Sequence, residues 1–176
     1  MPVVNDPNWN LPDAPSFTLT SPEFGEGDQL PVWARGSGAG AEDRSPTLHW
    51  SGAPENTRSF ALTVYDPDAP TGSGYWHWAV YNIPASVNSL PADAGNPDAG
   101  LLPEGAITLP NEARAERYRG AAPPSGHGPH RYVFTVSALD VESLDVPNGS
   151  TPARLGFMMR EHVIGRAQLI GLAETP

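Results

Sequence analysis

The chain has 176 residues, a formal net charge of −10 and a sequence pI near 4.7. This length suits one domain with a sizeable core, and the acidic balance argues against binding to nucleic acid or to anionic membrane surfaces. All ten basic residues are arginine and there is no cysteine, which excludes a Walker-type phosphate loop, lysine-dependent catalysis, thiol catalysis, disulfides and thiolate zinc sites.

Residues 1–15 are polar and rich in proline, and we expect them to form an extended surface arm of a single domain that spans residues 1–176. The first residues lack the basic region and apolar run of a secretory signal. No stretch reaches the length of a membrane span. We therefore expect a cytoplasmic protein without an integral membrane segment, and a mature exported protein is the alternative.

Alternation of apolar and polar residues predicts a series of strands. The two clearest cover residues 59–66 and 130–139. Residues 75–83 are apolar on both parities, which predicts a strand buried on both faces. Shorter strands are expected at residues 16–20, 30–34, 47–50, 106–109 and 166–172.

One clear helix is predicted late in the chain. Thr151 is typical of an N-cap and Pro152 of a first helical residue, and the helix should run to about Val163 and end before Gly165. Residues 111–118 are expected to form one or two helical turns. Many short strands between proline and glycine turns, with one helix, indicate a mainly β protein built as an antiparallel sandwich with short peripheral helices.

Asp66 is the residue around which the predicted site is built. It continues the apolar parity of Phe60, Leu62 and Val64, so a carboxylate falls where the next core side chain would be. Two prolines then end the strand pairing, because proline donates no backbone N–H. A buried carboxylate needs partners. The alternative is that Asp66 only caps a turn, since Asp before Pro commonly starts one.

His77 and His130 also sit at the ends of apolar strand faces, beside loops rich in proline and glycine. We expect both to converge with Asp66, which would accept a hydrogen bond from one imidazole while ring donors face a small cavity suited to phosphate or carboxylate. The alternatives are a satisfied core histidine for His77 and a strand-end surface residue for His130. We expect Arg131 to pair with an acidic side chain and His127 to be solvated.

Three segments resemble the phosphatidylethanolamine-binding protein family, which includes the Raf kinase inhibitor proteins. They are residues 64–70 (VYDPDAP), residues 76–82 (WHWAVYN) and residues 123–132 (PPSGHGPHRY). The resemblance is to the bacterial and archaeal branch and runs from about Phe17 to Gly171. It implies a β-sandwich of antiparallel sheets with a small cavity at one end that binds small anions, including phosphate and phosphorylated head groups.

The resemblance also implies which residues line that cavity. The expected ligand-binding residues are Asp66, His77 and His130 as pocket residues, and Pro70, Pro124 and Tyr132 as positions that shape the rim. Apart from the resemblance, Trp76 is a candidate for the cavity wall because it is next to His77, and the alternative is a core residue. The chain departs from the family at Gly120-Ala121-Ala122, where Gly-Pro is common. It also ends at Pro176, without the C-terminal helix of eukaryotic members, so lipid or kinase functions that depend on that helix are not carried over.

We expect a small-anion or phospho-ligand binding protein with no catalytic residue, no cofactor and no metal ion. Regulation of a partner kinase or protease and assembly as a homodimer are implied by the resemblance only. The alternative is a hydrolase or metal-dependent enzyme, since Asp66, His77 and His130 are also a possible metal-ligand set or acid–base set. A third hypothesis is an interaction protein whose acidic surface selects basic partners and whose pocket is vestigial.

Overall fold

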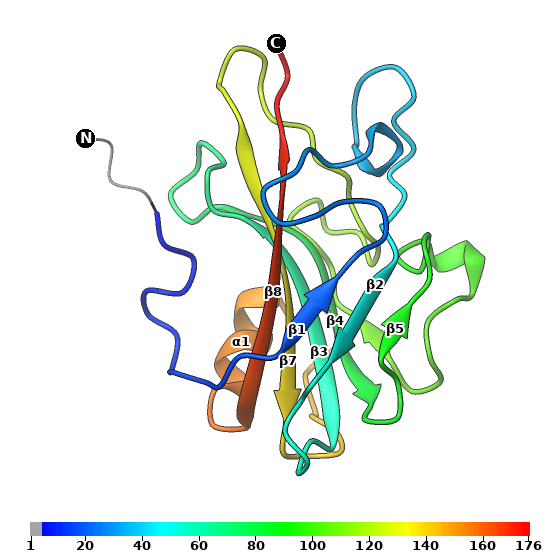
Figure 1. Ribbon diagram of the computed structural model, residues 1–176, viewed down its shortest axis with the longest axis vertical. Helices are drawn as coiled ribbons and strands as arrows, with labels where there is room; N and C mark the ends of the chain where they lie inside the picture. The colour runs from blue at the N-terminus through cyan, green and yellow to red at the C-terminus, as the bar shows by residue number, and fades with distance from the viewer. Residues whose placement is uncertain (1–4) are drawn as a thin grey trace.

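In the computed structural model, which describes residues 5–176, the chain folds into two antiparallel sheets and one α-helix (Figure 1). The expected mainly β sandwich is confirmed. The elements are β1 (Thr18–Thr20), the 3-10 helix η1 (Val32–Ala34), β2 (Leu48–Ser51), β3 (Ser59–Asp66), β4 (Tyr75–Pro84), β5 (Ser89–Leu90), the 3-10 helix η2 (Pro97–Ala99), β6 (Ile107–Thr108), β7 (His130–Leu139), α1 (Pro152–Met159) and β8 (Val163–Ala173).

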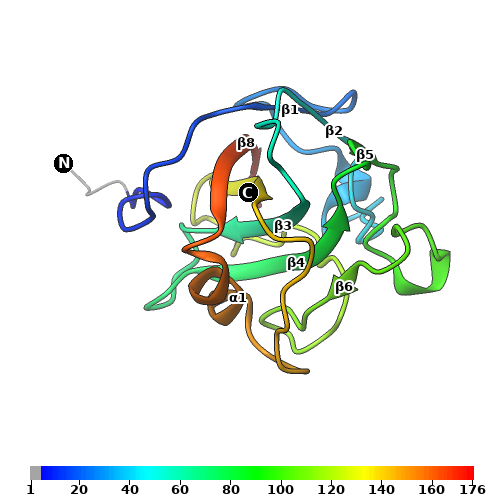
Figure 2. The same ribbon diagram turned by 90° about the horizontal axis from the view of Figure 1, so that it is seen from below.

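The large sheet has the strand order β6-β4-β3-β7-β8, and the small sheet has the order β1-β2-β5. Figure 2 shows the small sheet on one side of the large sheet and α1 on the other. All pairings between these strands are antiparallel. Strands β3, β4 and β7 therefore form the middle of the molecule and carry apolar residues on both faces.

The core has two parts, one on each face of the large sheet. The main part packs between the sheets and includes Trp50, Leu62, Trp78 and Phe134. The second part lies beneath α1 and includes Ala61, Ala79, Tyr81, Leu139 and Leu155. Burial of apolar area on both faces stabilises this arrangement, and it confirms that β4 is a strand buried on both sides.

Two predicted elements are wrong. Residues 30–34 do not form an edge strand, because the Ala34 N–H donates to the Pro31 carbonyl and closes the 3-10 turn of η1. Residues 111–118 contain no helix. The Asn111 side chain accepts from the Ala115 N–H and donates to the Arg117 carbonyl, and such local bonds compete with helical ones.

The late helix starts as predicted and ends earlier. Thr151 accepts a hydrogen bond from the Arg154 N–H at 3.1 Å, which confirms its role as N-cap. The helix stops at Met159, because Val163 already begins the pairing of β8 with β7. Gly165 lies inside β8, where a Cβ would come within 2.9 Å of Pro54, so close packing and not helix termination explains the glycine.

The predicted surface arm is described from Asn5 onward, and residues 5–15 contain no strand or helix. Asn8 exchanges hydrogen bonds with the Gln168 side chain, and Arg166 donates to the Pro12 carbonyl. The arm is therefore held against β8 by polar contacts.

The pairing between β3 and β4 contains a bulge that positions one residue of the site. Val64 lies opposite Trp78, whereas the next residue, Tyr65, lies opposite Trp76. His77 is therefore the extra residue of the bulge. An extra residue breaks the strict alternation of faces along a strand.

The bulge changes the direction of the His77 side chain. Strict alternation would place His77 on the same face as Ala79 and Tyr81, which pack beneath α1. In the structure His77 instead lines a cavity together with Asp66. Bulges commonly redirect side chains beside functional sites.

Candidate functional site

A cavity of about 170 Å³ lies at one end of the large sheet, where β3 ends and where β4 and β7 begin. Six of the seven candidate residues line it: Asp66, Pro70, His77, Pro124, His130 and Tyr132. This volume would hold about six water molecules at liquid density, and it is smaller than the sites of drug-sized ligands. The cavity suits a small ion or a compact head group.

Asp66 and His130 form a buried pair at the base of this cavity, with 3% and 1% of their surfaces exposed. His130 Nδ1 donates to Asp66 Oδ2 at 2.8 Å, and Asp66 Oδ1 accepts from the Asp68 N–H at 2.8 Å. Asp66 thus caps its turn and also orients the imidazole. The turn cap offered as an alternative is therefore present, but it is not the only role of Asp66.

His127 extends this pair into a chain of three polar side chains. Its side chain is exposed, as predicted for a solvated residue, yet its Nδ1 lies 2.6 Å from His130 Nε2. Both nitrogens of the His130 ring are therefore engaged, one by Asp66 and the other by His127. Only the turn at Gly126 and Gly128, with φ of 72° and 86°, brings His127 back over His130.

His77 is the second buried histidine of the cavity, with 5% of its surface exposed. Its Nδ1 lies 2.8 Å from the Arg119 carbonyl. Burial is the main cause that lowers the pKa of His77 to about 4, and the Arg119 charge adds to it. The Arg119 carbonyl and the charges of Asp66 and Asp43 oppose this only in part. At neutral pH the His77 ring is uncharged.

Arg119 is a cavity residue that the sequence analysis missed. It lines the cavity from the segment before the two prolines, and its backbone is tied to β4 because its N–H donates to the His77 carbonyl at 2.9 Å. Within residues 5–176 its guanidinium makes no hydrogen bond or ion pair with protein groups. No local pattern in the sequence marks it, because only the fold of this segment places it at the cavity.

The remaining lining residues complete the wall. They are Ala69, Thr71, Tyr75, Ala122 and Pro123. Tyr75 and Tyr132 flank His77, with ring centroids 4.9 Å and 5.1 Å from the imidazole. Burial, and then the negative charge of Asp66, raise the pKa of Tyr132 far above its usual value, so this phenol stays protonated.

Trp76 is the one candidate that does not line the cavity. Its ring stacks on Tyr65 with centroids 4.3 Å apart. Trp76 is outside the cavity lining because the bulge at His77 pairs it with Tyr65. Its neighbour Tyr75 lines the cavity instead.

Arg131 forms the predicted ion pair with an acidic side chain. Its Nε and one terminal nitrogen each lie 2.8 Å from a different oxygen of Asp68, and its backbone N–H also donates to that carboxylate. Burial alone would raise the pKa of Asp68, but the hydrogen bonds from Arg131 outweigh it and lower the pKa. This bidentate, charge-assisted contact belongs to the stronger class of hydrogen bonds. It joins the turn after β3 to β7 beside the cavity.

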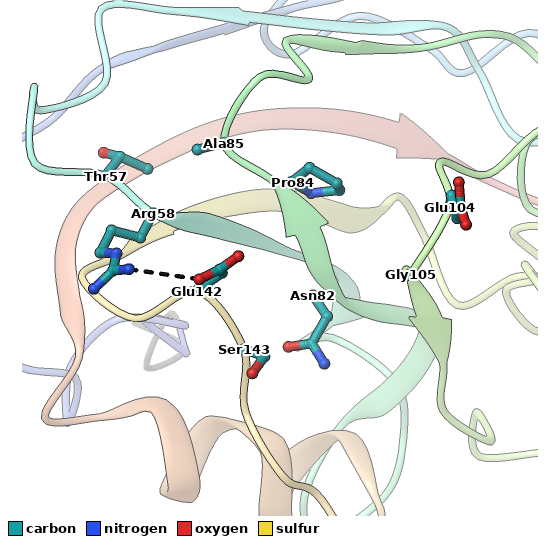
Figure 3. Close-up of a pocket in the computed structure, with 9 residues that line it drawn as sticks. All are labelled: Thr57, Arg58, Asn82, Pro84, Ala85, Glu104, Gly105, Glu142 and Ser143. Atoms are coloured by element: carbon teal, nitrogen blue, oxygen red, sulfur yellow. Dashed lines mark hydrogen bonds and ion pairs between the residues drawn. The ribbon is translucent and has the colours of Figure 1, made fainter.

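A larger cavity of about 660 Å³ lies at the opposite end of the sheet, where β3 begins and β4 ends (Figure 3). Arg58 and Glu142, which both line it, form an ion pair of 3.5 Å, and their side chains are 61% and 82% exposed. Asn82, with φ of 57°, donates to the Leu144 carbonyl and accepts from its N–H. Its polar groups are thus either exposed or already paired.

Two further features bear on the classes of function. Among residues 5–176, no group of three or more histidine, aspartate or glutamate side chains is arranged to hold a metal ion. In the same part of the chain, no helix combines the length and apolar character needed to cross a bilayer.

An antiparallel β fold with a small cavity at a sheet end, into which three buried polar side chains converge, defines a class of ligand-binding β-sandwich. Residues 20–174 match the family described as Phosphatidylethanolamine-binding protein. The chain therefore belongs to the phosphatidylethanolamine-binding protein family, as its resemblance predicted.

Bacterial relatives support this assignment. The chain is 47% identical over 163 residues to the UPF0098 protein YbcL of Escherichia coli K12, which covers 92% of this chain and 89% of the relative. It is 42% identical over 159 residues to YbhB of the same organism, with 88% and 98% covered. The crystal structure of E. coli YbcL superposes with a TM-score of 0.87 at 45% identity and covers 92% of this chain and 99% of that one. A relative from Mycobacterium tuberculosis, 34% identical over 169 residues with 96% and 78% covered, carries the name lipoprotein LppC.

Proposed function

We propose that this chain is a small-anion binding protein that takes phosphate, or a phosphorylated head group, into the cavity between Asp66, His77 and His130. The observation that carries the proposal is Arg119, an exposed arginine that contributes to the lining of the cavity and whose guanidinium has no protein partner within residues 5–176. Arginine matches the geometry of phosphate oxygens. A positive group without a partner beside a small cavity, in a chain of net charge −10, supports an anionic ligand.

Acid–base catalysis is a weaker candidate. The chain from Asp66 through His130 to His127 resembles the orientation of a catalytic base by a carboxylate. However, His130 Nε2, the nitrogen that would take a proton from a nucleophile, is bonded to His127. Binding therefore accounts for more of the site than hydrolysis does.

Two other parts of the proposal, a single domain over residues 1–176 and a cytoplasmic location, rest on the sequence. Assembly as a homodimer and regulation of a partner kinase or protease rest on the family alone. The mycobacterial relative named as a lipoprotein makes location the first of these to test. Cell fractionation and light scattering on the purified protein measure the location and the oligomeric state.

Calorimetric titration with inorganic phosphate tests the main proposal on wild type, Arg119→Ala and Arg154→Ala. We expect Arg119→Ala to weaken binding by about tenfold or more, since a hydrogen bond to a charged group contributes about 1.5–3 kcal/mol. Arg154 is the matched control, because it is an exposed arginine on α1 that also makes no side-chain bond within the described residues. Absence of phosphate binding by wild type, or equal loss in both variants, would refute the proposal.

A further inference from the structure

The protonation of His77 determines what kind of anion the cavity can hold. A carbonyl oxygen only accepts hydrogen bonds, so the 2.8 Å contact with the Arg119 carbonyl requires the proton on Nδ1. The ring has no carboxylate bonded to it, and burial lowers its pKa to about 4. The neutral imidazole therefore carries a lone pair on Nε2.

That lone pair is open to the cavity. His77 Nε2 has no hydrogen-bond partner among residues 5–176. The polar atoms that are both fully buried and without a partner, in the described part of the chain, are Arg35 Nε and the indole nitrogens of Trp50 and Trp78. His77 Nε2 is not one of them, so this nitrogen is accessible from the cavity. A ligand in the cavity thus meets an acceptor at His77.

The other polar groups of the cavity leave His77 Nε2 as an acceptor that a ligand must satisfy. His130 is engaged on both ring nitrogens by Asp66 and His127, and Asp66 is a second acceptor. The donors available to a ligand are the Arg119 guanidinium and the Tyr75 hydroxyl, because the Tyr132 hydroxyl is hydrogen-bonded to Asp66. Asp43, whose carboxylate accepts from the Gly120 N–H, is the remaining charge that acts on His77. An anion in this site needs oxygens that accept from Arg119 and one oxygen that donates to His77.

We infer that the cavity selects oxyanions that carry a proton, such as hydrogen phosphate and singly charged phosphate monoesters, over proton-free oxyanions such as sulfate, with the P–O–H group donating to His77 Nε2. This inference rests on the proposed anion-binding function and specifies its ligand chemistry. A phosphodiester carries no such proton, so we expect it to bind as weakly as sulfate does. Polar sites that lack a matching partner reject an analogue strongly, because a buried acceptor is then left facing another acceptor.

Phosphate and sulfate at pH ~8 provide a comparison of equal charge. Inorganic phosphate is then mainly the hydrogen phosphate dianion, and sulfate is a dianion of the same shape without a proton. We expect wild type to bind phosphate about ten- to a hundredfold more tightly than sulfate in calorimetric titration. Equal affinity for both anions would overturn the inference while leaving the anion site intact. Binding of neither anion would overturn the proposed function itself.

Two variants identify the discriminating group. His77→Gln supplies an amide N–H in place of the lone pair, so the preference for phosphate over sulfate should fall to about threefold or less. Arg119→Ala should weaken both anions by the same factor and leave their ratio unchanged. A ratio that survives in His77→Gln, or that collapses in Arg119→Ala, would contradict the role given to His77.

A soluble phosphate monoester separates a head-group ligand from free phosphate. Its second pKa is about 6, so it keeps its proton at pH ~5 and loses it at pH ~8. Its affinity should therefore fall by about tenfold between these values, whereas that of inorganic phosphate, still protonated at pH ~8, should not. A monoester that binds equally well at both pH values would overturn the inference for head groups.

Discussion

At the scale of single residues, burial lowers the pKa of His77. Its folded pKa of about 4 lies below the ordinary value of 6.5. Between these two values the unfolded ring takes up a proton that the folded ring does not. The contribution of His77 to stability is therefore fully present above pH 6.5 and is lost as the pH falls toward about 4.

This linkage predicts an acid-sensitive stability that depends on one side chain. We expect the free energy of unfolding of wild type to fall by up to ~3 kcal/mol more than that of His77→Gln between pH ~6.5 and pH ~4. Urea unfolding at a series of pH values measures the difference. His49→Gln is the control, because His49 is an exposed histidine on β2 and should keep the wild-type slope. A slope that is the same in all three proteins would show that His77 ionises freely in the folded state.

At the scale of elements, the site depends on the end of β3, the bulge in β4 and the turn between them. The turn after β3 supplies Asp66 and Pro70, and it is tied to β7 by the ion pair between Asp68 and Arg131. It returns to β4 through Gly74, whose φ is +72°. A glycine is required there, since a Cβ would collide with the Tyr65 hydroxyl and come within 2.7 Å of the Asp66 carbonyl.

Gly74→Ala should therefore disturb both the stability and the cavity. We expect a loss of about 2–3 kcal/mol in unfolding free energy, from the positive φ and the collision with backbone, together with weaker phosphate binding, because Asp66 belongs to the displaced segment. Thermal unfolding and phosphate titration measure the two effects. Gly72→Ala is the matched control in the same turn, since its φ is not positive and its Cβ would meet nothing within 4 Å. Equal behaviour of the two variants would show that the turn adapts without strain.

At the scale of the whole molecule, the net charge of −10 would oppose the approach of an anion to the proposed binding site. Under the proposed function, the attraction would come from local groups at the cavity, chiefly Arg119. Salt screens the long-range repulsion within about 10 Å at 0.1 M ionic strength, while short contacts inside the cavity are screened less.

Raising the ionic strength should therefore not weaken phosphate binding in the usual way. Between ~20 mM and ~300 mM salt, we expect the association rate of phosphate to rise or to stay within about twofold, because screening removes repulsion from the acidic surface. Stopped-flow competition with a reporter anion measures this rate, with a salt of a large organic anion that cannot enter the cavity. A tenfold fall in affinity over this range would indicate that long-range attraction, and not the local site, draws the anion in.

The sequence by itself determined much of the architecture, because strand alternation reports burial one residue at a time. The strands around Leu62 and Phe134, the N-cap at Thr151 and the strand end at Asp66 follow from local patterns that the tertiary structure preserves. The positions of Asp66 and His130 at the ends of apolar faces predicted that they would meet, and they do. The resemblance in three segments was enough to predict the family.

Only the tertiary structure decided how the cavity is charged and which side chains face it. The bulge that turns His77 inward and Trp76 outward arises from the pairing of two strands, which neither strand encodes alone. Arg119 reaches the cavity because its segment binds β4, and local side-chain bonds keep that segment from becoming a helix. The neutral state of His77 follows from its burial, and a carbonyl 42 residues further along the chain fixes the proton of the ring on Nδ1. Burial and contacts between distant residues are properties of the folded chain, so the order of residues specifies them only through the fold.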